Sequence, residues 1–223
     1  MIQQATFTFL RKLAKNNNRE WFHANKATYD AAKQNVLDVV GQLIGQVNKF
    51  DKTLGYPDPK KCFFRIARDT RFSYDKSPYK LNFGAIINSE GTTRSELSGY
   101  YLHVEPGNCF VSCGVYMGMP DVIKAVRTAI DEDFNIFSKI VNQKEFARQI
   151  GDLARDEDAL SRVPTGFDKN SPAAEYLKLK HFYVFVPVSD KEALSDSFIK
   201  KVTGLYKIMY PFNDFLNQAI KNK

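Results

Sequence analysis

The sequence predicts an α+β fold with a mainly antiparallel sheet of about five strands, covered by helices from both ends of the chain. Strand-like runs are concentrated in the middle of the chain, and amphipathic runs with helical spacing lie on either side of them. Short turns join successive strands, and strands joined in this way pair antiparallel. With 223 residues, 43% of them hydrophobic, the chain can bury a core without disulfides, and we expect a single domain over residues 1–223.

Two helices are expected in the first 50 residues. Apolar residues with helical spacing in residues 7–13 predict a short helix that ends before the polar run 16–18. A second helix should begin at this run and continue to Val47, because Asn17 and Glu20 have the spacing of a capping box.

Five short runs have the composition of strands. They are rich in aromatic and β-branched residues and are bounded by glycine, proline and asparagine. These runs are residues 62–67, 81–88, 100–105, 109–116 and 182–188. The third and fourth should form a hairpin, since Gly107 in the intervening turn can adopt a positive φ.

The remaining segments are predicted to be helices and one long loop. A helix should start at Pro120, since proline is favoured at the first helical position, and short helices are expected at 134–141 and 144–150. Residues 152–172 are polar and are expected to form a surface loop. An amphipathic run closes the chain, and Pro211 should kink it or begin a second helix.

Positive charge is concentrated in residues 60–80. This segment carries seven of the 32 lysines and arginines but only two of the 25 acids, so it accounts for most of the formal net charge of +7. A locally positive field favours an anionic partner. The chain lacks a P-loop, a dinucleotide-binding glycine motif, a nucleophile elbow and an RNA-binding aromatic strand. A small anionic ligand is therefore a better expectation than nucleic acid.

Cysteine content and hydropathy predict a cytoplasmic protein. Three cysteines cannot all pair with one another, and the first residues lack the apolar run of a secretory signal. No apolar stretch reaches the roughly 20 residues that a membrane-spanning helix needs. We expect no membrane partner, and the sequence indicates no particular cofactor or oligomeric state.

Residues 65–80 read RIARDTRFSYDKSPYK, and this run resembles the signature of a bacterial family defined by a domain of unknown function. The signature is R-x-x-R-D-x-R-F followed closely by D/N-K-x-x-Y. The runs NNNREWFHANK, GYYLHVEPGN and FNDFLN also resemble this family, so the resemblance covers nearly the whole chain. It implies no particular activity or cofactor, only that these positions form the hallmark site of the family.

The cations of this motif are the candidate ligand-binding residues. Guanidinium groups remain charged and present planar forks of donors that suit carboxylate or phosphate. A lysine or a tyrosine hydroxyl beyond the turn could add charge and a donor to the same site. The predicted anion site comprises Arg65, Arg68, Arg71, Lys76, Tyr79 and Lys80.

Two alternatives remain open at the level of sequence, and so does the question whether the protein is an enzyme. His103 and Glu105 lie two residues apart in a predicted strand and so share one face with Tyr101. If the fold brings them to Asp69 and Asp75, the four side chains could support metal-assisted phosphoester hydrolysis or transfer. Alternatively, the acids and arginines form a network that only stabilises the fold.

Overall fold

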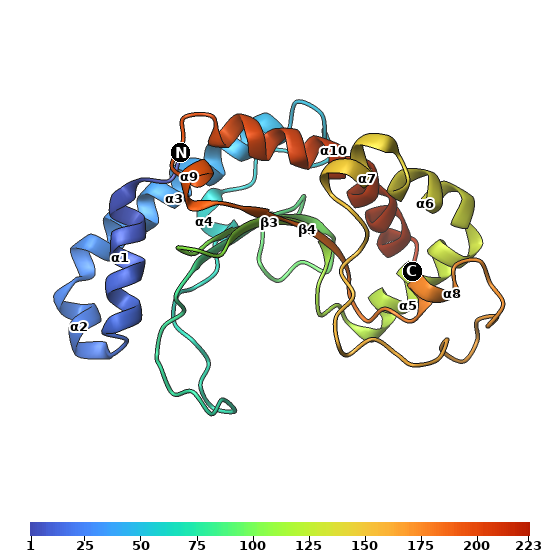
Figure 1. Ribbon diagram of the computed structural model, residues 1–223, viewed down its shortest axis with the longest axis horizontal. Helices are drawn as coiled ribbons and strands as arrows, with labels where there is room; N and C mark the ends of the chain where they lie inside the picture. The colour runs from blue at the N-terminus through green and yellow to red at the C-terminus, as the bar shows by residue number, and fades with distance from the viewer. The chain divides into compact units, whose positions relative to one another are not determined.

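The computed structural model describes residues 1–223 and has an α+β fold (Figure 1). One antiparallel sheet has the strand order β1-β2-β3-β4. Its strands are β1 (Phe83–Ile87), β2 (Gly99–Val104), β3 (Cys109–Val115) and β4 (Phe182–Val188). The α+β class and the β2–β3 hairpin were both predicted from the sequence, and Gly107 has a φ of 82° in the hairpin turn.

Ten helices accompany the sheet. The N-terminal helices are α1 (Gln4–Lys15), α2 (Arg19–Ala24), α3 (Lys26–Val47) and α4 (Pro59–Cys62). The central and C-terminal helices are α5 (Pro120–Glu132), α6 (Phe134–Val141), α7 (Lys144–Gln149), α8 (Ala174–Leu177), α9 (Asp190–Ala193) and α10 (Phe198–Lys221). None of them is long and apolar enough to cross a membrane.

The sheet has four strands instead of about five because residues 62–67 do not form one. Asp58 caps the short helix α4 by accepting a hydrogen bond from the backbone N–H of Lys60, so this run begins as a helical turn. The chain then pairs with neighbouring segments through two isolated β-bridges, Phe63 with Ala85 and Ala67 with Tyr79, and forms no continuous strand. The aromatic composition of this run indicated strand propensity, but strand formation requires a continuous partner.

The predicted second helix is divided in two. Its first cap is Asn18, whose side chain accepts a hydrogen bond from the backbone N–H of Trp21, and not Asn17. Helix α2 ends at Ala24, and α3 begins after Asn25. Near the other end of the chain, Pro211 lies inside α10 and starts no new helix.

Contacts group the chain into two compact units. Unit 1 comprises Met1–Thr93, Tyr101–Val111 and Pro187–Gly204, and unit 2 comprises Arg94–Tyr100, Ser112–Val186 and Leu205–Lys223. The single domain expected from the sequence stays a prediction.

Each unit has its own aromatic core. In unit 1, Phe9 and Tyr29 from the N-terminal helices pack against Phe83 of β1, with ring centroids 6.3 and 6.1 Å from that ring. Figure 1 shows α1, α2 and α3 side by side. In unit 2, Phe212 of α10 lies 6.5 Å from Phe137 and 6.1 Å from Phe146. Burial of these rings supplies the hydrophobic free energy that holds helices to strands.

The two faces of β2 differ in character. Tyr100, Leu102 and Val104 are buried, whereas the alternate positions Tyr101 and His103 are only partly buried. Because successive side chains of a strand point to opposite faces, the polar residues of β2 share the face that is not filled by the core.

Candidate functional site

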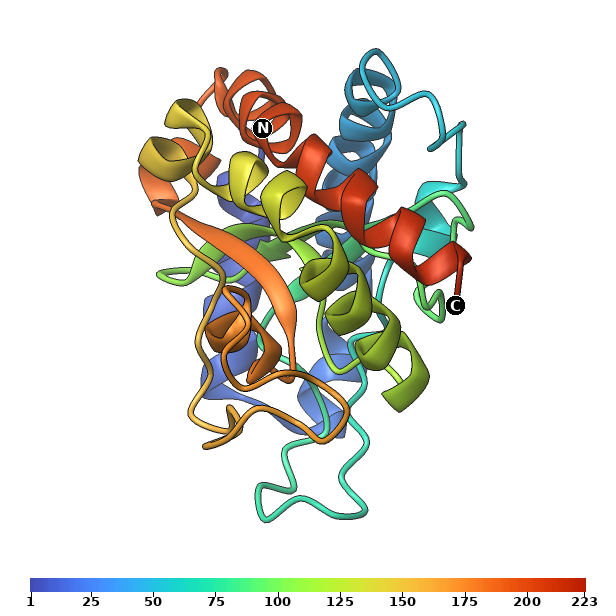
Figure 2. The ribbon, with the colours of Figure 1, turned by 90° about the vertical axis from the view of Figure 1, so that its right-hand side faces the viewer.

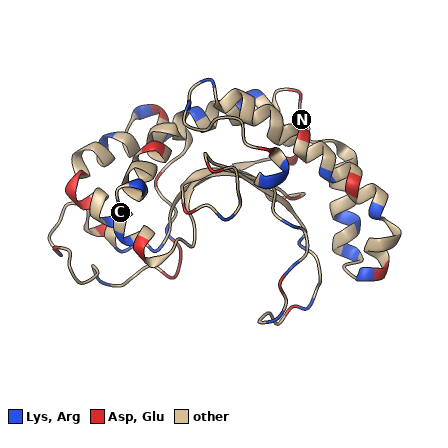
Figure 3. Ribbon diagram, turned by 180° about the vertical axis from the view of Figure 1, so that it is seen from behind, with Lys and Arg blue, Asp and Glu red and all other residues tan.

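Residues 65–80 form a loop that leaves the sheet beside β1 and returns to it; we call it the basic loop. Its two ends are joined by backbone hydrogen bonds from Arg68 N to the carbonyl of Pro78 (2.9 Å) and from Lys80 N to the carbonyl of Ile66 (2.8 Å). Figures 1 and 2 show the loop extending away from the strands, and Figure 3 shows the lysines and arginines along it. These two backbone hydrogen bonds therefore close the base of the basic loop.

Tyr79 anchors the base of the basic loop to the N-terminal helices. Its ring is buried and stacks on Phe22, with centroids 4.0 Å apart. Its backbone N–H donates to Asn17 Oδ1 at 3.1 Å, and its carbonyl accepts from Asn17 Nδ2 at 2.9 Å. The side chain of Asn17 thus holds both polar groups of Tyr79, and the ring of this candidate residue packs in the interior.

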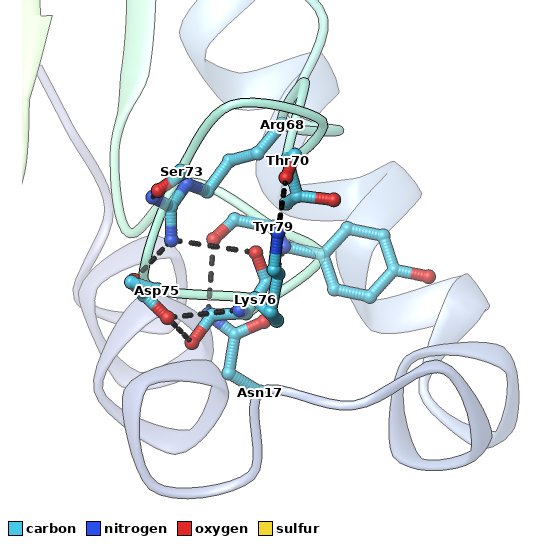
Figure 4. A network of polar contacts seen from close by, with 8 residues as sticks. Asn17, Arg68, Thr70, Ser73, Asp75, Lys76 and Tyr79 are labelled. Atoms are coloured by element: carbon cyan, nitrogen blue, oxygen red, sulfur yellow. Dashed lines mark hydrogen bonds and ion pairs between the residues drawn. The ribbon is translucent and has the colours of Figure 1, made fainter.

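Arg68 is engaged inside the loop (Figure 4). Its guanidinium forms an ion pair with Asp75 and also donates to Ser73 Oγ at 3.2 Å and to the carbonyl of Ser77 at 3.3 Å. Asp75 also accepts from the backbone N–H and the hydroxyl of Ser77, and these bonds, with that from Arg68, lower its pKa to about 2. Asp75 is therefore ionised at neutral pH and compensates Arg68.

Arg71 is compensated in a similar way. Its Nη2 lies 2.6 Å from Asp69 Oδ2 and its Nε lies 3.0 Å from Oδ1, a bidentate arrangement. The hydrogen bonds from Arg71 lower the pKa of Asp69, and those to Asp69 raise the pKa of Arg71. Lys76 donates to the carbonyl of Thr70 at 3.0 Å. All three cations therefore help to fold the loop, although their side chains remain near solvent.

Arg65 and Lys80, like Lys76, have no acid within ion-pair distance, and they differ from Lys76 in lying at the base of the loop. Asp69 is nevertheless within electrostatic range of Arg65, whose charge contributes to the lowered pKa of Asp69. Lys80 is half-buried, with Nζ 5.5 Å from the ring centroid of Phe64. Burial lowers the pKa of Lys80, and the charge of Arg65 lowers it further. The two cations thus lie within electrostatic range of each other, and neither forms an ion pair with a carboxylate at the base of the loop.

The tip of the basic loop exposes two aromatic side chains that the sequence analysis did not select. Phe72 and Tyr74 are 95% and 104% exposed. The guanidinium carbon of Arg71 lies 5.8 Å from the ring centroid of Phe72. Phe72 and Tyr74 stand between charged residues in a polar run, and this sequence context could have indicated that both rings are exposed to solvent.

A chain of hydrogen bonds runs along the open face of β2. Nε2 of His103 lies 3.0 Å from Glu105 Oε2, and Nδ1 lies 3.1 Å from the hydroxyl of Tyr101. With Glu105 accepting from Nε2–H, Nδ1 is the nitrogen that accepts from Tyr101. Burial lowers the pKa of His103, although Glu105 opposes this effect, and burial raises the pKa of Tyr101 to about 12. Phe110 stacks on the imidazole at 4.4 Å and fixes its plane.

The four residues of the metal hypothesis are not gathered into one group of ligand atoms. His103 lies in β2 and Glu105 directly after it, whereas Asp69 and Asp75 lie in the basic loop with their arginines. One group of three potential ligands does converge, in unit 2: Asp156, Asp158 and His181 have ligand atoms within 4.8 Å of one another. Only tertiary structure reveals this group, because His181 lies more than 20 residues beyond the two acids in the chain.

Comparison with known proteins gives one match. The family whose model matches is described as conserved hypothetical protein (DUF2461), and the match covers residues 5–215. No curated protein and no solved structure matches the chain significantly.

Proposed function

Because the chain belongs to the DUF2461 family of conserved hypothetical proteins, whose description names no reaction or ligand, we propose a function from the basic loop itself. The membership agrees with the resemblance predicted from the sequence. The protein binds a small anionic ligand, bearing a phosphate or a carboxylate, and Arg65 and Lys80 make the charged contacts.

The supporting observation is a pair of neighbouring cations, neither of which forms an ion pair with an acid. Arg65 and Lys80 repel each other, and partial burial of Lys80 removes some of the water that would screen its charge. An anion that contacts both cations relieves the repulsion and gains charge-assisted hydrogen bonds. Such a site binds because neither cation is engaged in an ion pair.

The other candidate residues act mainly through the shape of the loop. Arg68 and Arg71 already have carboxylate partners, so a ligand would have to compete with Asp75 and Asp69 for them. Lys76 closes the loop through Thr70 and adds to the positive field, and Tyr79 holds its base. In this assignment the signature motif builds a scaffold whose ends present Arg65 and Lys80.

The small number of uncompensated cations favours a small ligand over nucleic acid. A nucleic-acid backbone is bound by many cations that each release counterions, and the affinity then falls steeply with salt. Two cations at one point match one phosphate group or one dicarboxylate better than an extended strand.

Isothermal titration with inorganic phosphate and with malonate tests the proposal. Each charged hydrogen bond is worth about 1.5–3 kcal/mol, so Arg65→Gln and Lys80→Gln should each weaken binding by at least about tenfold. Lys33→Gln is the matched control, because Nζ of Lys33 lies 5.8 Å from the ring of Phe63 but outside the loop. It should leave the affinity within about twofold of the parent protein.

Three results would contradict the proposal. Absence of binding by the parent protein would leave Arg65 and Lys80 with a structural role only. Equal losses in Lys33→Gln and Lys80→Gln would show a non-specific charge effect. Tighter binding of a single-stranded oligonucleotide, with a steep salt dependence, would replace the small ligand by nucleic acid.

A further inference from the structure

Three rings meet in unit 2. Tyr116 follows β3, His181 precedes β4, and Tyr183 lies in β4. The ring centroid of Tyr116 is 4.7 Å from that of His181 and 5.4 Å from that of Tyr183, with interplanar angles of 46° and 82°. Tyr116 is 62% exposed, whereas His181 and Tyr183 are partly buried; we call these three rings the ring cluster.

Two carboxylates lie at the ring cluster. The hydroxyl of Tyr183 donates to Asp156 Oδ1 at 3.0 Å, and Nε2 of His181 is 3.6 Å from Asp158 Oδ2. The segment that carries both acids is tied at each end: Ala154 N donates to the carbonyl of Tyr183, and Leu160 N to that of Lys178, both at 2.9 Å. The acids are therefore placed against the rings by backbone pairing.

The charge around the ring cluster is negative. Residues 156–158 are three consecutive acids. Lys180 forms an ion pair with one of them, with Nζ 3.5 Å from Asp158 Oδ2. The pKa of Tyr183 is raised to about 12, first by burial and then by its hydrogen bond to Asp156 and the nearby acids. The local field therefore favours a positively charged ligand.

The tautomer of His181 argues against a metal ion as that ligand. The backbone N–H of Met117 donates to Nδ1 of His181 at 3.1 Å, so Nδ1 is the acceptor nitrogen. A neutral imidazole has one unprotonated nitrogen, and Nε2 therefore carries the proton toward Asp158. A metal ion binds a histidine nitrogen that carries a lone pair and no proton. If Nε2 were that nitrogen, the proton of the neutral imidazole would be on Nδ1, where it would face the backbone N–H of Met117.

We propose that the ring cluster, with Asp156 and Asp158, binds an organic cation of the alkylated ammonium type. The faces of tyrosine rings attract such a cation through their quadrupoles, and the carboxylates add net charge attraction. This class of ligand needs no lone pair from His181 and no stripping of a tightly held water shell. The rings and the acids are independent features that favour the same ligand, and the site does not depend on the anion site of the basic loop.

Titration with tetramethylammonium chloride, followed by amide chemical shifts of the full-length protein, tests the proposal. Saturable shifts should centre on Tyr116, His181 and Asp158. Tyr116→Ala should weaken binding by roughly fivefold, whereas Tyr116→Phe should keep it within about twofold, since the ring face is the contact. Asp158→Asn should also weaken it, and its effect should shrink as salt is added.

Tyr74→Ala is the control, because it removes an even more exposed tyrosine from the basic loop and should leave tetramethylammonium binding unchanged. A titration with zinc chloride tests whether the site binds a metal ion instead of an organic cation. Tight zinc binding that shifts the Met117 amide, absence of saturable tetramethylammonium binding, or an unchanged affinity in Tyr116→Ala would each overturn the proposal. Thermal melting of each variant confirms that it is folded.

Discussion

Replacing Asn17 with alanine should release the base of the basic loop. The change removes two hydrogen bonds at once, because the amide of Asn17 both donates to and accepts from the backbone of Tyr79. A typical hydrogen bond contributes about 0.5–1.5 kcal/mol net, and a buried group left without a partner costs more. Tyr79 is buried, so water reaches its backbone poorly, and the total loss should be about 1–3 kcal/mol.

Thermal and urea denaturation measure this loss. For a chain of this length, each kcal/mol lowers the melting temperature by about 2–4 °C, so the expected decrease is about 2–12 °C. Asn16→Ala is the matched control, because its side chain makes only an exposed hydrogen bond to the carbonyl of Lys12. Phosphate affinity should also fall several-fold in Asn17→Ala, since Lys80 directly follows Tyr79.

The reasoning would be refuted if Asn17→Ala and Asn16→Ala melted at the same temperature. If Asn17→Ala were destabilised but bound phosphate with unchanged affinity, Asn17 would anchor the fold without positioning the anion site.

Three further perturbations test other parts of the structure. Gly84→Ala should cost about 1–3 kcal/mol in urea denaturation, because a Cβ there would lie 2.6 Å from the Tyr101 hydroxyl; an unchanged midpoint would contradict this packing. Arg68→Ala should cost no more than about 1 kcal/mol, since its pair with Asp75 is near the surface, and a loss of several kcal/mol would indicate a buried pair. His103 has a lowered pKa, so its contribution is complete above its unfolded value near 6.5 and is lost as pH falls below it; His103→Gln should flatten the stability profile there.

The partners of the arginines in the signature motif could not be predicted from the sequence. The sequence predicted that Arg65, Arg68 and Arg71 belong to one anion site, because they are the guanidinium groups of the signature motif. Loop closure instead pairs Arg68 with Asp75, seven residues further along, and Arg71 with Asp69, two residues before it. These pairings decide which cations are neutralised by a carboxylate, and the order of charges along the sequence does not specify the pairings.

Secondary structure was predicted best where the signal is local. Strand β4 has the predicted bounds, and α5 begins at the predicted Pro120, because side-chain composition and proline geometry act within a few residues. The strand predicted over residues 62–67 was wrong, because this segment has strand-like composition but no continuous neighbouring strand to pair with. The break between α2 and α3 was missed because apolar spacing continues across Asn25.

From its residues alone, the chain could be assigned to its family and to the α+β class, and its positive charge could be located in one segment. Tertiary structure alone decided that Arg65 and Lys80 form no ion pair and that Tyr116, Asp158 and His181 meet. The physical reason is that composition and periodicity govern local conformation, whereas contacts between distant side chains depend on strand pairing and loop closure. Those distant contacts determine which charges are neutralised and which remain able to bind a ligand.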